Sequence, residues 1–135
     1  MPNHYSNVVT ASFEGENTDP AALTEWATGL LERIAPTPPD IRHPDPRYMS
    51  DAQVEWCNTT RGTKWDVYDI APPVEIPGDC GAYLIAFCTA WSPPSDEMRA
   101  LAVADAKSRG IRVLSWVGLD PYDDTAETLY RRSKP

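Results

Sequence analysis

The chain has 135 residues, a formal net charge of −8 and a pI near 4.6. This length indicates one domain over residues 1–135, large enough to bury a core without a metal or a disulfide. The acidic field repels phosphate backbones and so disfavours a nucleic-acid binder, whereas it suits a partner with a basic surface; solubility is the plainer interpretation.

The first half of the chain predicts a strand, a helix and a Pro-rich insertion. Residues 5–13 alternate apolar and polar side chains, as a strand does. Residues 19–35 begin with an Asp-Pro helix start and carry one apolar stripe, and the proline that follows ends the helix. The insertion, residues 36–62, is irregular at first and then predicts a short helix over 50–60, with Ser50 as its cap.

The second half predicts three more strands and a second long helix. The strands are residues 63–70, 82–91 and 111–117, and the helix runs from a Ser92-Pro93 start to a Gly110 cap. The middle strand is the most apolar run in the chain and is apolar on both faces, which indicates a central strand covered on both sides. The polar tail, residues 120–135, predicts a short helix over 124–132.

This order of elements predicts an α+β domain of the ferredoxin-like, split βαβ class. Such a domain has a four-stranded antiparallel sheet with two helices on one face. The other face must then be covered by the insertion and the tail, or by a second subunit or a partner protein. Tyr68, Tyr83 and Phe87 are expected on that open face, although the chain lacks the basic residues that RNA binding there would need.

The sequence offers no set of residues that predicts catalysis, a cofactor or a metal site. Asp66 and Asp69 are three apart on a predicted strand and therefore point to opposite faces. His4 and His43 lie in a terminus and a Pro-rich loop, without the spacing of metal ligands. Cys80, in a Gly-Asp-Cys-Gly turn, is the one plausible nucleophile, and its acidic neighbour disfavours the thiolate.

The cysteines and the N-terminus indicate a compartment. Three cysteines without CxxC spacing, no leader and no apolar stretch of membrane-spanning length predict a protein of the reducing cytoplasm. Cys88, in an apolar strand, is expected to be a buried free thiol.

Two short tryptophan motifs stand out: Gly62-Thr63-Lys64-Trp65-Asp66 and Thr89-Ala90-Trp91-Ser92-Pro93-Pro94. Together with the Met1-Pro2-Asn3 start and Asn7, they resemble the phage- and plasmid-encoded Api-ninety-two-like family. The resemblance covers the first strand and residues 50–117, and departs from the family at Arg61, where members tend to have an aromatic residue. It implies a mobile-element origin and a ferredoxin-like fold, and it brings no catalytic residues.

The residues of the two motifs can also be interpreted without the family resemblance. Trp65 and Trp91 are expected near edges of the core, where an indole buries its ring and still uses its N–H. Asp66 is expected to accept a hydrogen bond from a loop or a helix N-terminus. A folding signature is the plainer interpretation, and a partner-binding patch around Lys64, Asp66 and Trp91 is the functional one.

The first functional hypothesis is a non-enzymatic phage or mobile-element accessory protein in the host cytoplasm. It binds a host protein with a basic surface and inhibits or modulates it, a nucleic-acid-handling defence complex being one candidate. The predicted partner-binding residues are Asp66, Trp91, Asp120, Asp123, Asp124 and Glu127. The acidic ones can imitate a run of phosphates, or they can be a solvated helix start.

Two alternatives remain open. One is a small-molecule binder or an enzyme of unknown reaction, with its pocket between the open sheet face and the Pro-rich insertion. The other is a homodimer assembled through the sheet. Fold and family do not decide among the three hypotheses.

Overall fold

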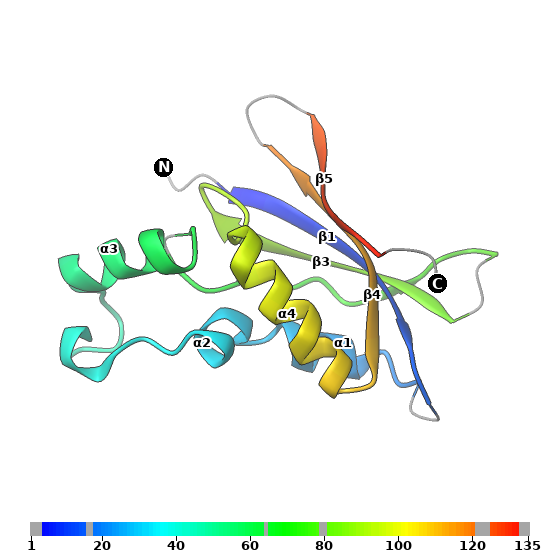
Figure 1. Cartoon of the computed structure of the whole chain (residues 1–135), viewed down its shortest axis with the longest axis horizontal. Helices are drawn as coiled ribbons and strands as arrows, with labels where there is room; N and C mark the ends of the chain where they lie inside the picture. Colours follow the sequence, from blue (N-terminus) through cyan, green and yellow to red (C-terminus); the bar gives the residue numbers. More distant parts are fainter. Residues whose placement is uncertain (1–3, 16–17, 64, 79–80, 121–124, 133–135) are drawn as a thin grey trace.

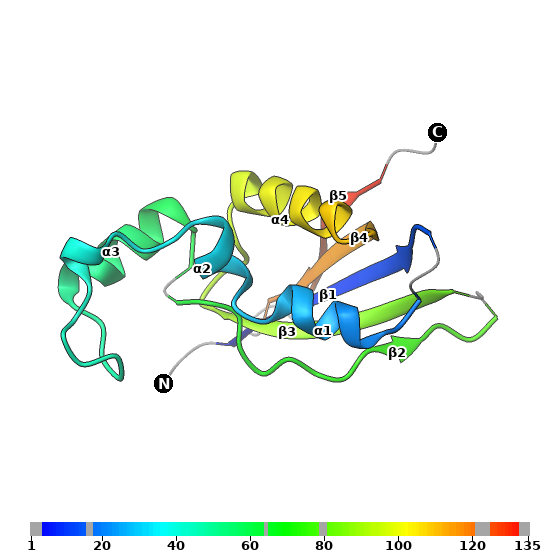
Figure 2. The same cartoon turned by 90° about the horizontal axis from the view of Figure 1, so that it is seen from below.

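The computed structural model describes residues 4–15, 18–63, 65–78, 81–120 and 125–132. It shows an antiparallel sheet with helices packed on one side, so the predicted α+β class is confirmed (Figures 1 and 2). The strands are β1 (His4–Phe13), β2 (Val74–Glu75), β3 (Ala82–Ala90), β4 (Ile111–Leu119) and β5 (Ala126–Arg131). The helices are α1 (Ala21–Ala27), α2 (Leu30–Ile34), the 3-10 turn η1 (Pro39–Ile41), α3 (Asp51–Thr60) and α4 (Asp96–Ser108).

The sheet has five strands among the described residues, where four were predicted, in the order β2-β3-β1-β4-β5. The central strand β1 pairs with β3 on one side and with β4 on the other, both antiparallel. Its alternating side chains divide between the two faces of the sheet: Val9 and Ala11 are fully buried, whereas Val8 and Thr10 are half-buried.

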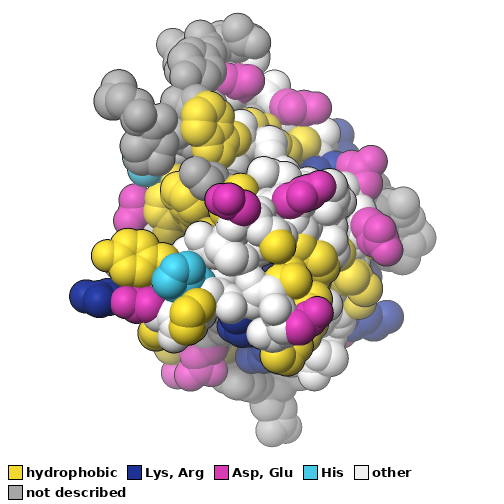
Figure 3. All heavy atoms as spheres, turned by 90° about the vertical axis from the view of Figure 1, so that its left-hand side faces the viewer, with side chains coloured by type: hydrophobic (Ala, Val, Ile, Leu, Met, Phe, Trp, Pro, Cys, Tyr) yellow, Lys and Arg dark blue, Asp and Glu magenta, His cyan; other side chains and the backbone are white. Residues whose placement is uncertain are grey.

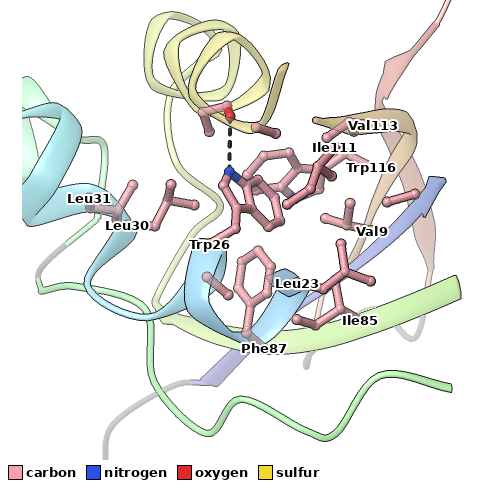
Figure 4. Packing of buried hydrophobic residues seen from close by; sticks show 14 of the residues in the cluster. Val9, Leu23, Trp26, Leu30, Leu31, Ile85, Phe87, Ile111, Val113 and Trp116 are labelled. Carbon is pink, nitrogen blue, oxygen red and sulfur yellow. Dashed lines mark hydrogen bonds between the residues drawn. The ribbon is translucent and has the colours of Figure 1, made fainter. Parts of the chain in front are cut away.

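The hydrophobic core lies between this sheet and the helices α1, α2 and α4 (Figure 4). At its centre three buried aromatic rings pack edge to face, Trp26 from α1, Phe87 from β3 and Trp116 from β4, with ring centroids 5.7 to 6.4 Å apart. The Trp26 indole N–H also donates a hydrogen bond of 3.1 Å to the carbonyl of Ala102 in α4. These buried rings therefore pack the helices against the sheet, and the buried indole N–H of Trp26 has a hydrogen-bond partner.

The single helix predicted for residues 19–35 is two short helices. Thr28 is extended and Gly29 has a φ of +64°, a left-handed conformation that glycine adopts without steric cost. The apolar stripe continues across this break, because Trp26 and Ala27 of α1 and Leu30 of α2 are all fully buried. The periodicity of the stripe was therefore a correct guide to burial and a wrong guide to helix continuity.

The strand predicted for residues 63–70 is wrong. Among its described residues, only Tyr68 pairs with the neighbouring strand, through a bridge to Cys88. Asp69 has a φ of +51°, which interrupts an extended chain. The edge of the sheet is taken instead by the two-residue strand β2, further along the chain.

The helix predicted for residues 124–132 is also wrong, because β5 occupies this part of the tail. β5 pairs with β4, whose outer backbone groups would otherwise lack partners, and Leu129 and Tyr130 pack against the core. Hydrogen bonding to the free edge of β4 therefore outweighs the weak helical pattern of this polar segment.

The two remaining helices start at serine caps. α3 was predicted correctly: Ser50 accepts a hydrogen bond from the Gln53 N–H as part of a capping box. α4 begins three residues later than its predicted start, at the cap Ser95. The delay has a local cause, since a residue that precedes a proline is disfavoured in the helical region, and Ser92 is followed by Pro93 and Pro94.

Candidate functional site

The two tryptophan motifs are joined in the structure. The hydroxyl of Thr63 accepts a 3.0 Å hydrogen bond from the N–H of Ala90 and donates one of 2.8 Å to its carbonyl. The Ser92 hydroxyl donates to the carbonyl of Gly62. A side chain at Gly62 has no room, because a Cβ there would lie 2.9 Å from the backbone nitrogen of Ser95. The joint fixes how the chain leaves β3 and enters α4.

Asp66 has a structural role. Its carboxylate accepts hydrogen bonds from the N–H groups of Leu31, at 2.9 Å, and Glu32, at 3.2 Å, in the first turn of α2. The expectation that Asp66 binds a helix N-terminus is therefore confirmed. The half-buried carboxylate is therefore occupied within the fold.

Trp91 does not bury its ring as expected. It is 54% exposed and has a φ of +74°, a left-handed conformation that is rare for a bulky residue. Trp65 is half-buried, and its ring lies 6.2 Å from that of Tyr68. The tryptophans that bury their rings and use their N–H are Trp26 and Trp116, which lie outside the two motifs.

Asp120 and Glu127 lie together, at the end of the sheet where β4 leads toward β5. Glu127 pairs with Gly118 of β4, and the N–H of Asp120 donates a 3.4 Å hydrogen bond to the carbonyl of Thr125. Burial, and then the charges of Glu127 and Asp120, raise the pKa of the buried Tyr5 phenol. Asp123, Asp124 and Lys64 lie outside the described residues.

Trp91 emerges at this same end. β3 finishes with Ala90 beside His4, and β4 finishes with Leu119 beside Ser6, so the ends of both strands flank the start of β1. The first turn of α4 is also here, and the exposed Glu97 lies in it. We call the set Trp91, Glu97, Asp120 and Glu127 the acidic end.

The described surface carries much unpaired negative charge. Eight carboxylates are exposed and have neither an ion-pair nor a hydrogen-bond partner among the described residues. They are Glu25, Asp40, Asp51, Glu55, Asp69, Glu75, Glu97 and Glu127. Figure 3, which faces the side with α3, shows acidic side chains distributed among hydrophobic ones over much of the surface. A basic partner would meet carboxylates whose charge no neighbour neutralises.

An ion pair between a buried arginine and a carboxylate that is 37% exposed anchors the insertion to α2. The guanidinium of Arg61, whose side chain is 3% exposed, lies 2.6 Å from the carboxylate of Glu32, which also binds Thr37 and Arg42. Partial burial alone would raise the pKa of Glu32, but the hydrogen bonds from Thr37, Arg61 and Arg42 outweigh it and lower the pKa from 4.5 to about 2.

This shift predicts an acid-sensitive contribution to stability. Because the pKa of Glu32 is lower in the folded state, its stabilising effect is complete above pH 4.5 and disappears as the pH falls toward about 2. Urea unfolding over this range should show the parent and Glu32→Gln converging in stability as the pH falls. Glu55→Gln, which removes an exposed and unpaired carboxylate, should show no such convergence.

The open face of the sheet differs from the prediction in its side chains. Phe87 is buried under the helices, and Tyr83 packs edge to face on Phe13, whose ring lies against the core. The open face presents Leu84, half-buried Cys88 and, through its bridge to Cys88, half-buried Tyr68. Burial raises the pKa of the Cys88 thiol. Of the three aromatic residues predicted on the open face, Tyr68 alone lies there, where its ring is 5.4 Å from that of His4.

The described residues of the insertion and of the tail do not lie over this face. In Figures 1 and 2 the insertion with α3 leads away from one end of the sheet, and the tail forms β5 at its edge. Leu84 and Leu119 remain 38% and 40% exposed. A pocket of about 280 Å³ lies elsewhere among the described residues, between α4 and the β4–β5 edge.

The described residues contain no group of three or more His, Cys, Asp and Glu side chains that could hold a metal ion. In the same parts of the chain, no helix is both long enough and apolar enough to span a bilayer. A comparison with known protein families, curated proteins and solved structures finds no match to any of them.

Proposed function

We propose that this chain is a non-enzymatic accessory protein of a phage or plasmid that acts in the host cytoplasm. It binds a host protein with a basic surface and inhibits or modulates it; a nucleic-acid-handling defence complex is the kind of partner whose basic groove an acidic surface would occupy. The resemblance of the two tryptophan motifs to the Api-ninety-two-like family belongs to this proposal, and the contact between the motifs supports reading them as one unit.

The fold proposal is a ferredoxin-like, split βαβ domain with a reduced second strand. The antiparallel order β3-β1-β4, with α4 connecting β3 to β4, supports it. The Tyr68 bridge and β2 would be what remains of the strand expected beside β3. β5 would be an addition at the opposite edge.

One observation carries the functional proposal: Trp91 is exposed at the acidic end in a conformation that costs stability. A non-glycine residue held in the left-handed region costs about 1 kcal/mol or more, and such positions concentrate at functional sites. Exposed tryptophans are also common among the residues that dominate protein interfaces. An aromatic anchor at the same end as the unpaired carboxylates of Glu97 and Glu127 suits a basic partner with an apolar depression.

Trp91→Gly separates binding from folding. Glycine adopts a φ of +74° without strain, so the free energy of unfolding should stay within about 1 kcal/mol of the parent or rise. Partner binding should weaken by about 2 kcal/mol or more, roughly 30-fold, as expected for a central anchor. Chemical unfolding and affinity for the captured partner are the two measurements.

The partner is captured by a pull-down from host lysate at low and high salt, followed by mass spectrometry. We expect one stoichiometric partner that is lost at high salt. Glu97→Lys and Glu127→Lys, which reverse charges of the acidic end, should weaken the complex. Glu75→Lys, a reversal of an equally exposed and unpaired carboxylate on β2, is the matched control. Equal losses from all three variants would contradict a localised site.

A homodimer through the open sheet face is the alternative that exposed Val74, Leu84 and Leu119 favour. A monomeric mass in solution would exclude it.

A further inference from the structure

Unpaired positive charge is scarce in the part of the chain that the structure describes. Of the ten lysines and arginines in the described residues, seven form ion pairs. The three that form none are Lys107, Arg131 and Arg132. Two of these three, Lys107 and Arg132, line the same pocket. This gathering of free cations stands out in a chain with a net charge of −8.

The pocket lies between α4 and the strands β4 and β5, with a volume of about 280 Å³. Lys107 comes from the last turn of α4, Arg112 from the start of β4, and Arg132 follows β5. The backbone N–H of Arg132 is fixed by a 2.9 Å hydrogen bond to the carbonyl of Leu114, which continues the pairing of the two strands. Three cations from three elements therefore line one concavity.

The rest of the lining is mostly apolar. Ile111 and Val113 belong to the core, Val103 and the Tyr130 ring pack against it, and all four line the pocket. Glu14 is the one carboxylate in the lining, and it holds the Arg112 guanidinium at 3.0 Å. The Arg112–Glu14 pair is neutral, so the lining has a formal charge of +2, carried by Lys107 and Arg132.

We propose that this pocket binds a small organic anion: a carboxylate or a phosphate monoester attached to an aromatic or aliphatic body. Guanidinium and ammonium groups form charge-assisted hydrogen bonds with either oxyanion. The apolar wall would cover the body of the ligand, which an inorganic ion lacks. The volume suits one ring or a short chain. The site is at the opposite end of the sheet from the acidic end, since β1 finishes and β4 begins here.

The test is an NMR titration of the whole chain with three probes of similar size. Phenyl phosphate and benzoate carry the two candidate oxyanions, and benzamide is the uncharged match. We expect saturable shifts of the Val103, Lys107, Val113 and Tyr130 amide signals with at least one of the anions, and at least tenfold weaker binding of benzamide. An absence of saturable shifts at these amides with both anions, or equal binding of benzamide, would overturn the proposal.

Variants locate the site. Lys107→Met and Arg132→Gln should each weaken binding of the anion roughly tenfold or more, the loss expected for one charge-assisted hydrogen bond. Val103→Phe should block binding by filling the pocket without changing the charge. Arg131→Gln removes an equally unpaired cation that points to the opposite face of β5, and should change affinity less than twofold. Similar losses from Arg131→Gln and Arg132→Gln would mean that the anion senses surface charge alone, and would overturn the site.

Discussion

Replacing Asn7 with leucine should lower the free energy of unfolding by about 3 kcal/mol or more, although the two side chains are similar in size. Asn7 is fully buried in the middle of the sheet. Its side-chain oxygen accepts a 3.0 Å hydrogen bond from the indole N–H of Trp116, and its amide donates one of 3.0 Å to the hydroxyl of Thr89. Leucine would leave the buried Trp116 N–H without a partner, and such a group costs about 1 to 3 kcal/mol by itself.

We expect the substitution also to loosen the turn that carries Trp91. Thr89, which binds Asn7, donates a 2.7 Å hydrogen bond to the carbonyl of Ser92 across that turn. Urea unfolding monitored by tryptophan fluorescence measures the loss. Thr10→Val is the control: it lies on β1 but on the open face, and should change stability by less than about 1 kcal/mol. An Asn7→Leu protein as stable as the parent would show that the hydrogen-bonded chain contributes nothing net.

Arg61→Met should cost about 2 to 4 kcal/mol. The buried guanidinium donates to the carboxylate of Glu32 at 2.6 Å, to the carbonyl of Ala35 at 2.7 Å and to the hydroxyl of Thr37 at 3.3 Å. It also lies over the ring of Trp56, 5.0 Å from the ring centroid, and so ties α3 to α2. Methionine keeps the apolar stem but none of the donors, so the Ala35 carbonyl loses a buried donor and the Glu32 carboxylate, which is 37% exposed, loses one of its three cationic or hydroxyl partners.

Arg42→Met is the matched control, because it removes a second cation from the same carboxylate at a side chain that is 47% exposed. Ion pairs of this exposure contribute at most about 1 kcal/mol. Equal losses at the two arginines would show that burial of Arg61 does not matter. A loss at Arg61 that persists in a Glu32→Gln background would assign the effect to the backbone carbonyl and the Trp56 ring rather than to the ion pair.

The parts of the fold that the sequence predicted are those with a strong period. β1, β3, β4 and the body of α4 follow the alternation or the helical stripe of their own residues, and α3 follows its serine cap. The predictions failed where a single residue, or a partner distant in the sequence, determines the local conformation. Gly29 and Asp69 each place one left-handed residue inside a regular pattern. The tail becomes a strand only because the edge of β4 is available to it.

The candidate sites divide in the same way. The role of Asp66 was predicted as one of two options, a hydrogen bond from a loop or from a helix N-terminus, and the first turn of α2 supplies it. The exposure of Trp91 was not, because it depends on a turn geometry set by Thr63 and Ser92. The cationic pocket was beyond prediction once the tail was assigned to a helix. Arg132 lines the same pocket as Lys107 only because β5 pairs with β4, and no local sequence pattern indicates this.

The irregular segment beside β3 has a consequence for aggregation. β3 is the most apolar strand, and its outer edge is occupied by a few bonds from residues 68–76, among them the 2.9 Å bonds of the Ala71 and Ile76 N–H groups. Pro72 and Pro73 in that segment have no N–H with which to template another strand. The segment therefore shields β3 from pairing with a second chain. Local detachment of residues 68–76, well before global unfolding, would be the step that exposes an aggregation-prone edge.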